Sequence, residues 1–119
     1  MNRPPHAAAP MPDPTNRMTE GWHCLHLYYR VNAVALAALT PEQREQGKEE
    51  LIAALDPGGD AAPERLQVSI VSGHKADLGL MLLDPDPLAL DRVQQAVRAT
   101  GLGAVLDLDW SFVSITEVS

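Results

Sequence analysis

Residues 66–83 read LQVSIVSGHKADLGLMLL, and this stretch decides the fold. A strand is predicted from Leu66 to Val71, because apolar and polar side chains alternate from Leu66 to Ile70, the period-two pattern of a strand with one buried face. A second apolar run follows from Leu78 to Leu83 after a connection at residues 72–77. A connection this short can only join neighbouring antiparallel strands, so the middle of the chain predicts an antiparallel strand pair.

A helix is predicted before this pair. Thr40 is an N-cap residue, Pro41 suits the first helical position, and Gln43 completes a Thr-x-x-Gln capping box. Residues 56–59, Asp-Pro-Gly-Gly, end the helix. The inward stripe of this helix is predicted to be Gly47, Leu51, Ala54 and Leu55. A short helical turn is also expected within residues 32–39, which are rich in alanine.

A second helix is predicted after the strand pair, and it begins in the same way. Asp86 is a cap residue and Pro87 follows it at the first helical position. Gly101 is expected at the position after the C-cap, where glycine adopts a left-handed backbone without strain. The buried stripe of this helix is predicted to be Leu90, Val93 and Val97.

The first and the last strand complete the ordered part of the chain, at about residues 22–31 and 105–118. In the last strand, the alternation from Leu106 to Phe112 predicts that Leu106, Leu108, Trp110 and Phe112 share one face. Beyond Phe112 the apolar phase shifts by one residue. We interpret this shift as either a bulge or a strand end that is covered on both sides.

The element order β-α-β-β-α-β is typical of the ferredoxin-like fold, an α+β architecture in which both helices cover one face of an antiparallel sheet. The first strand carries large side chains on both of its faces. The face of the sheet that no helix covers is therefore apolar, whichever of two sets of side chains lies on it. The two sets are Cys24, His26 and Tyr28, or Leu25, Leu27 and Tyr29. An apolar sheet face of this size favours association, and we expect it to pack on a second ferredoxin-like sheet.

The chain is predicted to have two zones. Residues 1–20 hold five of the ten prolines and little other apolar surface, so we expect a disordered Pro-rich leader. Residues 21–119 form the ferredoxin-like domain. The leader's charges cancel, so the whole net charge of −7 belongs to this domain.

The overall composition argues against several functions. Nine Lys and Arg against sixteen Asp and Glu disfavour binding to nucleic acid or to an anionic membrane surface. No apolar run reaches the ~18 residues of a membrane-spanning helix, and Ala7–Ala9 is too short for the apolar core of a secretory signal. With one cysteine and therefore no internal disulfide, a cytoplasmic location is expected.

Individual residues offer no complete catalytic or metal site. His23 and His26 are three apart on a strand and point to opposite faces, whereas Cys24 and His26 share a face. A zinc site would need further ligands, and only His74 remains in the ordered zone, so no metal site is predicted. Cys24 has no helix N-terminus beside it to lower its pKa and is interpreted as structural.

The acidic pairs also have simple structural explanations. Asp84 and Asp86 flank Pro85 before a helix, which is cap and turn chemistry. Asp107 and Asp109 are expected on the solvent face of the last strand. Phosphate-binding and nucleophile-elbow motifs are absent from the sequence, and no catalytic residue is predicted.

Four segments resemble the chlorite dismutase-like haem protein family, and the likeness extends over residues 22–119. The strongest are residues 74–86 and 110–119, supported by residues 27–31 and 100–103. Within that family the chain is most similar to the coproheme decarboxylases, which make haem b from coproheme III. The Lys-Ala-Asp-Leu-Gly segment and the Thr-Glu-Val-Ser ending carry this closer likeness.

The resemblance implies a protein of two ferredoxin-like domains whose sheets pack into a dimeric α+β barrel, with subunits in rings that are usually five-membered. It also implies that haem or coproheme and its axial histidine belong to the C-terminal domain, whereas this chain resembles the N-terminal one. By this likeness, Ser119 and, less directly, Glu117 lie at the periphery of a cofactor held by another chain. Tyr28 and Tyr29 do not correspond to the family's catalytic tyrosine.

Three hypotheses follow. The first is that this chain is the structural half of a haem enzyme, a coproheme decarboxylase, whose haem-binding domain is on a second chain in a ring-shaped hetero-oligomer. The second is a stand-alone homo-oligomeric α+β barrel that binds a small molecule between sheet and helices or acts as a cofactor-independent oxygenase. The third is a regulatory module whose effector loop would be residues 72–77. We favour the first.

Overall fold

The sheet has four strands in the order β2-β3-β1-β4, and all neighbouring strands are antiparallel. The computed structural model describes residue 15 and residues 17–116. The elements are β1 (His23–Val31), α1 (Ala33–Ala37), α2 (Pro41–Ala54), β2 (Arg65–Ile70), β3 (Leu78–Asp84), α3 (Pro87–Arg98), a 3-10 turn (Gly103–Val105) and β4 (Leu106–Ile115).

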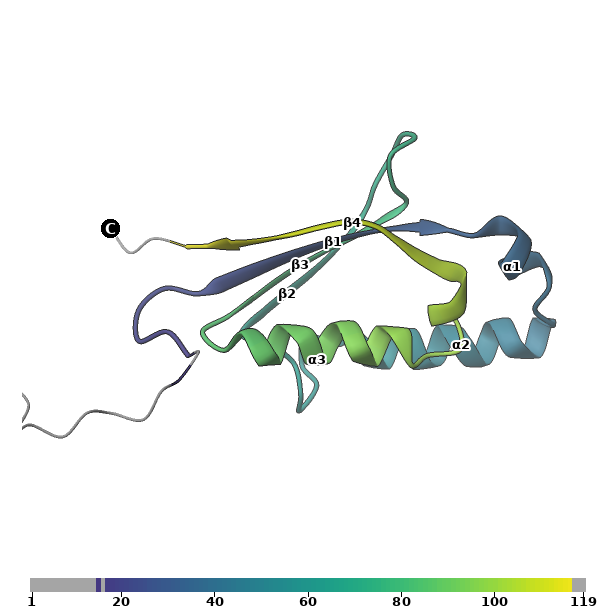
Figure 1. Cartoon of the computed structure of the whole chain (residues 1–119). Coiled ribbons are helices and arrows are strands. Elements are labelled where there is room, and N and C mark those ends of the chain that lie inside the picture. The colour runs from purple at the N-terminus through teal and green to yellow at the C-terminus, as the bar shows by residue number, and fades with distance from the viewer. Residues whose placement is uncertain (1–14, 16, 117–119) are drawn as a thin grey trace, which may run out of the picture.

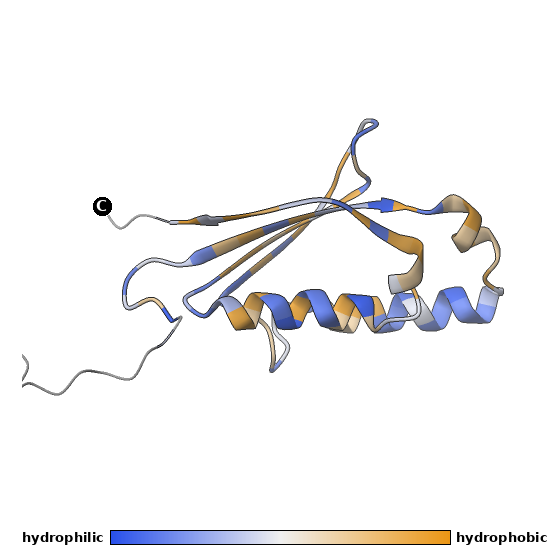
Figure 2. Ribbon diagram, viewed as in Figure 1, coloured by the Kyte–Doolittle hydropathy of each residue, from blue (hydrophilic) through white to orange (hydrophobic). Residues whose placement is uncertain are grey.

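The layer arrangement is the predicted one. Both α2 and α3 lie on one side of the sheet, and the other side carries no helix (Figure 1). This is the ferredoxin-like α+β fold. In Figure 2, α2 is largely hydrophilic along its length, whereas hydrophobic and hydrophilic residues alternate along α3. The difference follows from position, because α3 runs beneath the central strands and α2 lies further out.

The helix starts are built by the capping residues that the sequence predicts. The Thr40 hydroxyl accepts a hydrogen bond from the backbone N–H of Gln43, and the Gln43 side chain accepts one from the backbone N–H of Thr40. The Asp86 carboxylate caps α3 by accepting from the backbone N–H of Leu88. These bonds satisfy N–H groups that have no partner inside a helix.

The core lies between α3 and the two central strands. Leu27 on β1, Leu82 on β3 and Val97 on α3 are almost fully excluded from solvent. The predicted stripe of α3 is confirmed, since Leu90, Val93 and Val97 are all buried in this cluster. Burying each such side chain contributes about 1.5–3 kcal/mol relative to leaving it in water.

The predicted facing of the last strand is wrong. Leu108 lies opposite Tyr29 while Trp110 lies opposite Tyr28, so Asp109 is an extra residue in β4. Such a bulge reverses the alternation. Leu106 and Leu108 therefore face the helices, whereas Trp110 and Phe112 face the other side of the sheet. We interpreted the phase shift beyond Phe112 as either a bulge or a covered strand end, but pairing is regular from Trp110 to Ile115 and the bulge lies at Asp109. The regular alternation from Leu106 to Phe112 in the sequence hides it.

The prediction for Gly101 is also wrong. The C-cap of α3 is Ala99, so Thr100 occupies the next position, and Gly101 does not have a positive φ. Thr100 can end the helix because its hydroxyl donates a hydrogen bond to the carbonyl oxygen of Val97 at 2.8 Å. A residue without a side chain is needed at position 101 for another reason. It packs against Gly47 of α2, where a Cβ would lie 3.3 Å from the Gly47 Cα.

The predicted leader, residues 1–20, lies largely outside the described residues. Of its described part, the backbone N–H of Met18 donates a hydrogen bond to the carbonyl oxygen of Pro85 at 2.9 Å. Within residues 15 and 17–116, no helix combines the length and the apolar character needed to cross a bilayer.

Candidate functional site

One face of the sheet carries no helix, and its composition marks it as the candidate functional surface. Residues paired across neighbouring strands share a face, so the register identifies this surface without ambiguity. We call it the open sheet face. Its central members are Cys24, His26, Tyr28, Gly79, Met81, Leu83, Trp110, Phe112 and Ser114. Of the two sets that the sequence left open, the Cys24, His26 and Tyr28 set is therefore the uncovered one.

Stacked aromatic rings run across the open sheet face from β1 to β4. The rings of His26 and Phe112 are 4.1 Å apart with an interplanar angle of 12°. The rings of Tyr28 and Trp110 are 5.2 Å apart at 19°, and Trp110 also contacts Phe112. Trp110 is 60% exposed despite these contacts. Such rings gain considerably more from burial than from stacking alone, so this row is suited to contact with another apolar surface.

Cys24 and His26 form the only predicted pair that the structure brings together on this face. The Cys24 Sγ lies 3.2 Å from the His26 Nε2. Cys24 is buried, and His23 points to the opposite face, as the sequence predicts. His74 is in the loop between β2 and β3, at the far end of the sheet. Within the part of the chain that the structure describes, no group of three or more His, Cys, Asp or Glu side chains is arranged to hold a metal ion.

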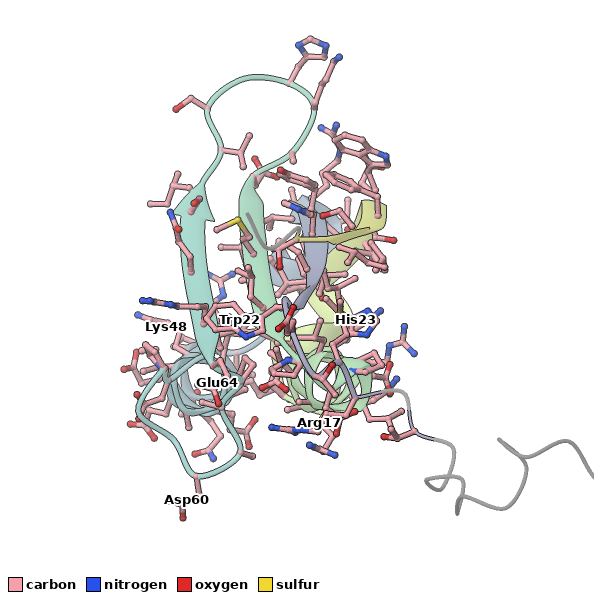
Figure 3. The ribbon with its side chains drawn as sticks, turned by 90° about the vertical axis from the view of Figure 1, so that its left-hand side faces the viewer. Arg17, Trp22, His23, Lys48, Asp60 and Glu64 are labelled. Carbon is pink, nitrogen blue, oxygen red and sulfur yellow. The ribbon has the colours of Figure 1, made fainter. Side chains whose placement is uncertain are left out.

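The loop between β2 and β3 borders the open sheet face. It rises from the sheet on the side away from the helices (Figures 1 and 3). Arg30 fixes it by donating a hydrogen bond to the carbonyl oxygen of His74, and the Asp77 carboxylate accepts from the backbone N–H of Val31 at 2.8 Å. Between this loop and Trp110 is a largely apolar cavity of about 490 Å³, with Lys75 at its border.

Of the two acidic pairs, Asp84 and Asp86 have the cap and turn roles that the sequence predicts, and Asp107 and Asp109 lie at the surface. The buried Asp84 carboxylate accepts hydrogen bonds from the backbone N–H groups of Glu64 and Asp86. Asp109 is exposed and lies 3.7 Å from the Arg30 guanidinium. Asp107 is also exposed. Glu117 and Ser119, the residues expected near a cofactor, lie outside the described residues.

At the other end of the open sheet face, the Trp22 ring contacts the guanidinium group of Arg65. The Arg65 guanidinium carbon is 6.0 Å from the centroid of the Trp22 ring. Figure 3 shows Trp22 at the end of the sheet nearest the helices, far from the β2–β3 loop. The aromatic surface is therefore bounded by one cation at each end, Arg65 and Arg30.

Known proteins share this fold. The chlorite dismutase family model matches residues 44–119, which is most of the chain. The chain belongs to the chlorite dismutase family. A haem-binding protein from Thermus thermophilus is 27% identical, with a TM-score of 0.70 over 88% of this chain and 43% of that one. A mutant chlorite dismutase from Candidatus Nitrospira defluvii is 15% identical, with a TM-score of 0.68 over 85% of this chain and 42% of that one.

This family member spans less than half the length of the solved structures that it matches. A haem site needs a large cavity and a side chain, such as histidine or cysteine, that ligates the iron. The cavity on the helix side measures about 290 Å³, too small for a tetrapyrrole, and no histidine or cysteine lines it. His74 borders the larger cavity, but no described residue forms a hydrogen bond with its exposed ring of the kind that orients an axial histidine.

Sequence reasoning found the strands of this surface but not the surface itself. Trp110 and Phe112 were assigned to the same side as Leu108, so the aromatic row across β1 and β4 was missed. No signal within β4 reveals this row, because Asp107 and Asp109 occupy equivalent polar positions of the alternation and only the pairing with β1 distinguishes them.

Proposed function

We propose that this chain supplies the haem-free ferredoxin-like half of a haem protein in the chlorite dismutase family. Its open sheet face packs on the sheet of a second ferredoxin-like domain, and that domain binds haem or coproheme. The observation that carries this proposal is the aromatic row of His26, Phe112, Trp110 and Tyr28, which lies on the face that no element of the described chain covers.

The composition of the open sheet face supports a protein partner. None of its central residues is Asp, Glu, Lys or Arg, although the chain as a whole carries a net charge of −7. Depletion of charge and enrichment in aromatic rings are the features that distinguish the centre of a protein interface from ordinary surface. The acidic residues are instead concentrated elsewhere, notably on α2 with Glu42, Glu45, Glu49 and Glu50.

The length comparison supports the identity of the partner. The matched proteins are more than twice as long as the part that this chain covers, and one of them is described as haem-binding. A second ferredoxin-like domain fits the remaining length. It would close the two sheets into an α+β barrel and would carry the residues that hold the iron.

We further propose that the assembled protein is a coproheme decarboxylase and that its subunits form a ring, five-membered by family resemblance. The Lys75–Gly79 and Thr116–Ser119 segments support the decarboxylase assignment through their likeness to that branch. In this assignment the present chain contributes no catalytic residue. It positions the haem-binding domain and provides contacts within the ring.

The test is to co-express the full chain with the coding sequence that follows it in the genome. We expect one complex by native mass spectrometry, with a Soret absorbance band after coproheme is added. Trp110→Lys should abolish the complex, because it places a charge at the centre of the contact. Ile52→Lys is the matched control, since Ile52 is 69% exposed on α2 and lies away from the open sheet face.

Two results would contradict the proposal. One is a parent chain that stays monomeric beside a folded haem-binding domain. The other is equal assembly of the Trp110→Lys and Ile52→Lys variants. A colourless symmetric homodimer would instead support the stand-alone barrel that binds a small molecule, for which a cavity between sheet and helices is the structural basis.

A further inference from the structure

A second cavity, on the helix side of the sheet, is formed entirely by this chain. It measures about 290 Å³ and lies between the C-terminal half of α3 and the start of β4. Its walls include Tyr29 from β1, Arg98 from α3 and Leu108 from β4. The size is at the lower end of the range for small-molecule pockets. Because it is on the opposite side of the sheet from the aromatic row, the proposed domain contact leaves it open.

Tyr29 is the unusual member of this wall. The residue is only 5% exposed, yet its hydroxyl forms no hydrogen bond with any described residue. No fully buried side-chain oxygen or nitrogen of the described residues lacks a partner, so this hydroxyl must still reach solvent. The cavity that Tyr29 lines is the space it opens to. A hydroxyl that reaches solvent and has no partner among the described residues is available to donate a hydrogen bond to a ligand.

Arg98 brings a positive charge to the same cavity. It is the last residue of α3 and forms no ion pair with another described residue. Arg98 and Tyr29 line the same cavity. Burial raises the pKa of the Tyr29 hydroxyl, and the Arg98 guanidinium partly opposes that rise. The carbonyl end of α3 carries roughly half a negative charge, which a full guanidinium charge outweighs.

The rest of the cavity is apolar or neutral. Val97, Leu106 and Leu108 provide apolar wall, and Gln94 provides an amide. Asp107 also borders the cavity, but it pairs with Arg30 in the register, and alternation therefore directs its carboxylate to the open sheet face. Two hydrogen-bond donors, Arg98 and Tyr29, thus line a cavity whose other walls are largely apolar or neutral.

We propose that this cavity binds a small carboxylate with an apolar body. The Arg98 guanidinium and the Tyr29 hydroxyl donate hydrogen bonds to the carboxylate, and the apolar body lies against Val97, Leu106 and Leu108. Guanidinium and phenol donors fit a carboxylate well, since the fork of Arg can bind both oxygens. The described residues make this site complete without the haem-binding domain.

The test uses the purified full chain and two probes of the same shape, benzoate and uncharged benzamide. Binding is followed by isothermal titration calorimetry and by NMR shifts of the amides of α3 and β4. We expect benzoate to bind and benzamide to bind at least about tenfold more weakly, because benzamide cannot pair with a cation. Arg98→Gln should weaken benzoate binding at least about tenfold, and Tyr29→Phe about fivefold.

The control is Arg92→Gln, which removes the same charge from the same helix but outside this cavity. It should leave benzoate binding unchanged. Tyr29→Phe removes one oxygen that has no protein partner, so the variant should fold as the parent does, and circular dichroism checks this. The proposal is overturned if benzoate does not bind up to about 10 mM, or if Arg98→Gln and Arg92→Gln weaken it equally. Either result leaves the assembly experiment unaffected.

Discussion

The contact between α2 and the turn after α3 leads to a specific stability prediction for Gly47→Ala. A Cβ at position 47 would lie 2.8 Å from the Leu102 Cγ and 2.9 Å from the Leu102 backbone nitrogen. The side chain of Leu102 can rotate away, but the backbone cannot move as easily. The neighbouring Gly101 N–H donates a hydrogen bond to the Glu50 carboxylate at 2.7 Å, which ties that turn to α2.

Two effects of opposite sign decide the magnitude. Alanine in a helix interior is favoured over glycine by about 1 kcal/mol. Overpacking a closed contact typically costs about 1–3 kcal/mol, and a clash with backbone falls in the upper part of that range. We therefore expect Gly47→Ala to lower the free energy of unfolding by about 1–2 kcal/mol, although the same change at an open helix position would raise it. For about 100 ordered residues this corresponds to a fall in Tm of roughly 5–10 °C.

Urea and thermal unfolding followed by circular dichroism would measure this effect. Glu49→Ala, at an exposed position of the same helix, is the control and should change stability by less than about 0.5 kcal/mol. Gly101→Ala should be less costly than Gly47→Ala, because its Cβ would approach Glu50 and Gly47 only to 3.1 and 3.3 Å. A Gly47→Ala variant as stable as the parent would refute the close approach of α2 to this turn.

Three further outcomes can be checked by urea unfolding. Thr40→Ala removes a side-chain acceptor of the α2 capping box and should lower the free energy of unfolding by about 1 kcal/mol. Thr40→Ser keeps a hydroxyl acceptor and should retain most of that stability. Equal losses in the two variants would exclude the cap as the cause. Asp84→Ala leaves two backbone N–H groups without their acceptor and should cost about 2–3 kcal/mol, with a smaller loss for Asp84→Asn, which keeps one oxygen. Burial raises the pKa of Tyr29 above its ordinary value of 10.0, so the folded state holds this proton more tightly than the unfolded state does. Stability should therefore decline as the pH rises above about 10, and Tyr29→Phe should make that decline shallower; an unchanged slope would contradict the assigned shift.

The fold could be predicted from the sequence because local signals agreed with the tertiary arrangement. The capping residues at Thr40 and Asp86 fixed both helix starts, and the strands between residues 66 and 83 have a simple period. The order of elements then left few topologies to consider. Caps and strand periods depend on residues that are close in sequence, so the sequence alone was sufficient to predict the fold.

What failed depends on distant residues. The bulge at Asp109 is defined by pairing with β1, about eighty residues away, and no rule of alternation within β4 reveals it. The helix-side cavity depends on Tyr29, Arg98 and Leu108, which approach one another only when β1, α3 and β4 are assembled. The likeness to coproheme decarboxylases and the location of Ser119 and Glu117 relative to a cofactor stay predictions.

The outer edge of β4 has a practical consequence for handling the isolated protein. After the bulge, Trp110–Ile115 contains neither a proline nor a charged residue, and among the described strands only β1 pairs with β4. Asp107, Asp109 and the bulge protect the first part of this edge, whereas the part after the bulge has no such protection and can template the addition of strands from other molecules. We therefore expect concentrated preparations of the chain alone to aggregate more readily than dilute ones, so dilute samples suit solution work.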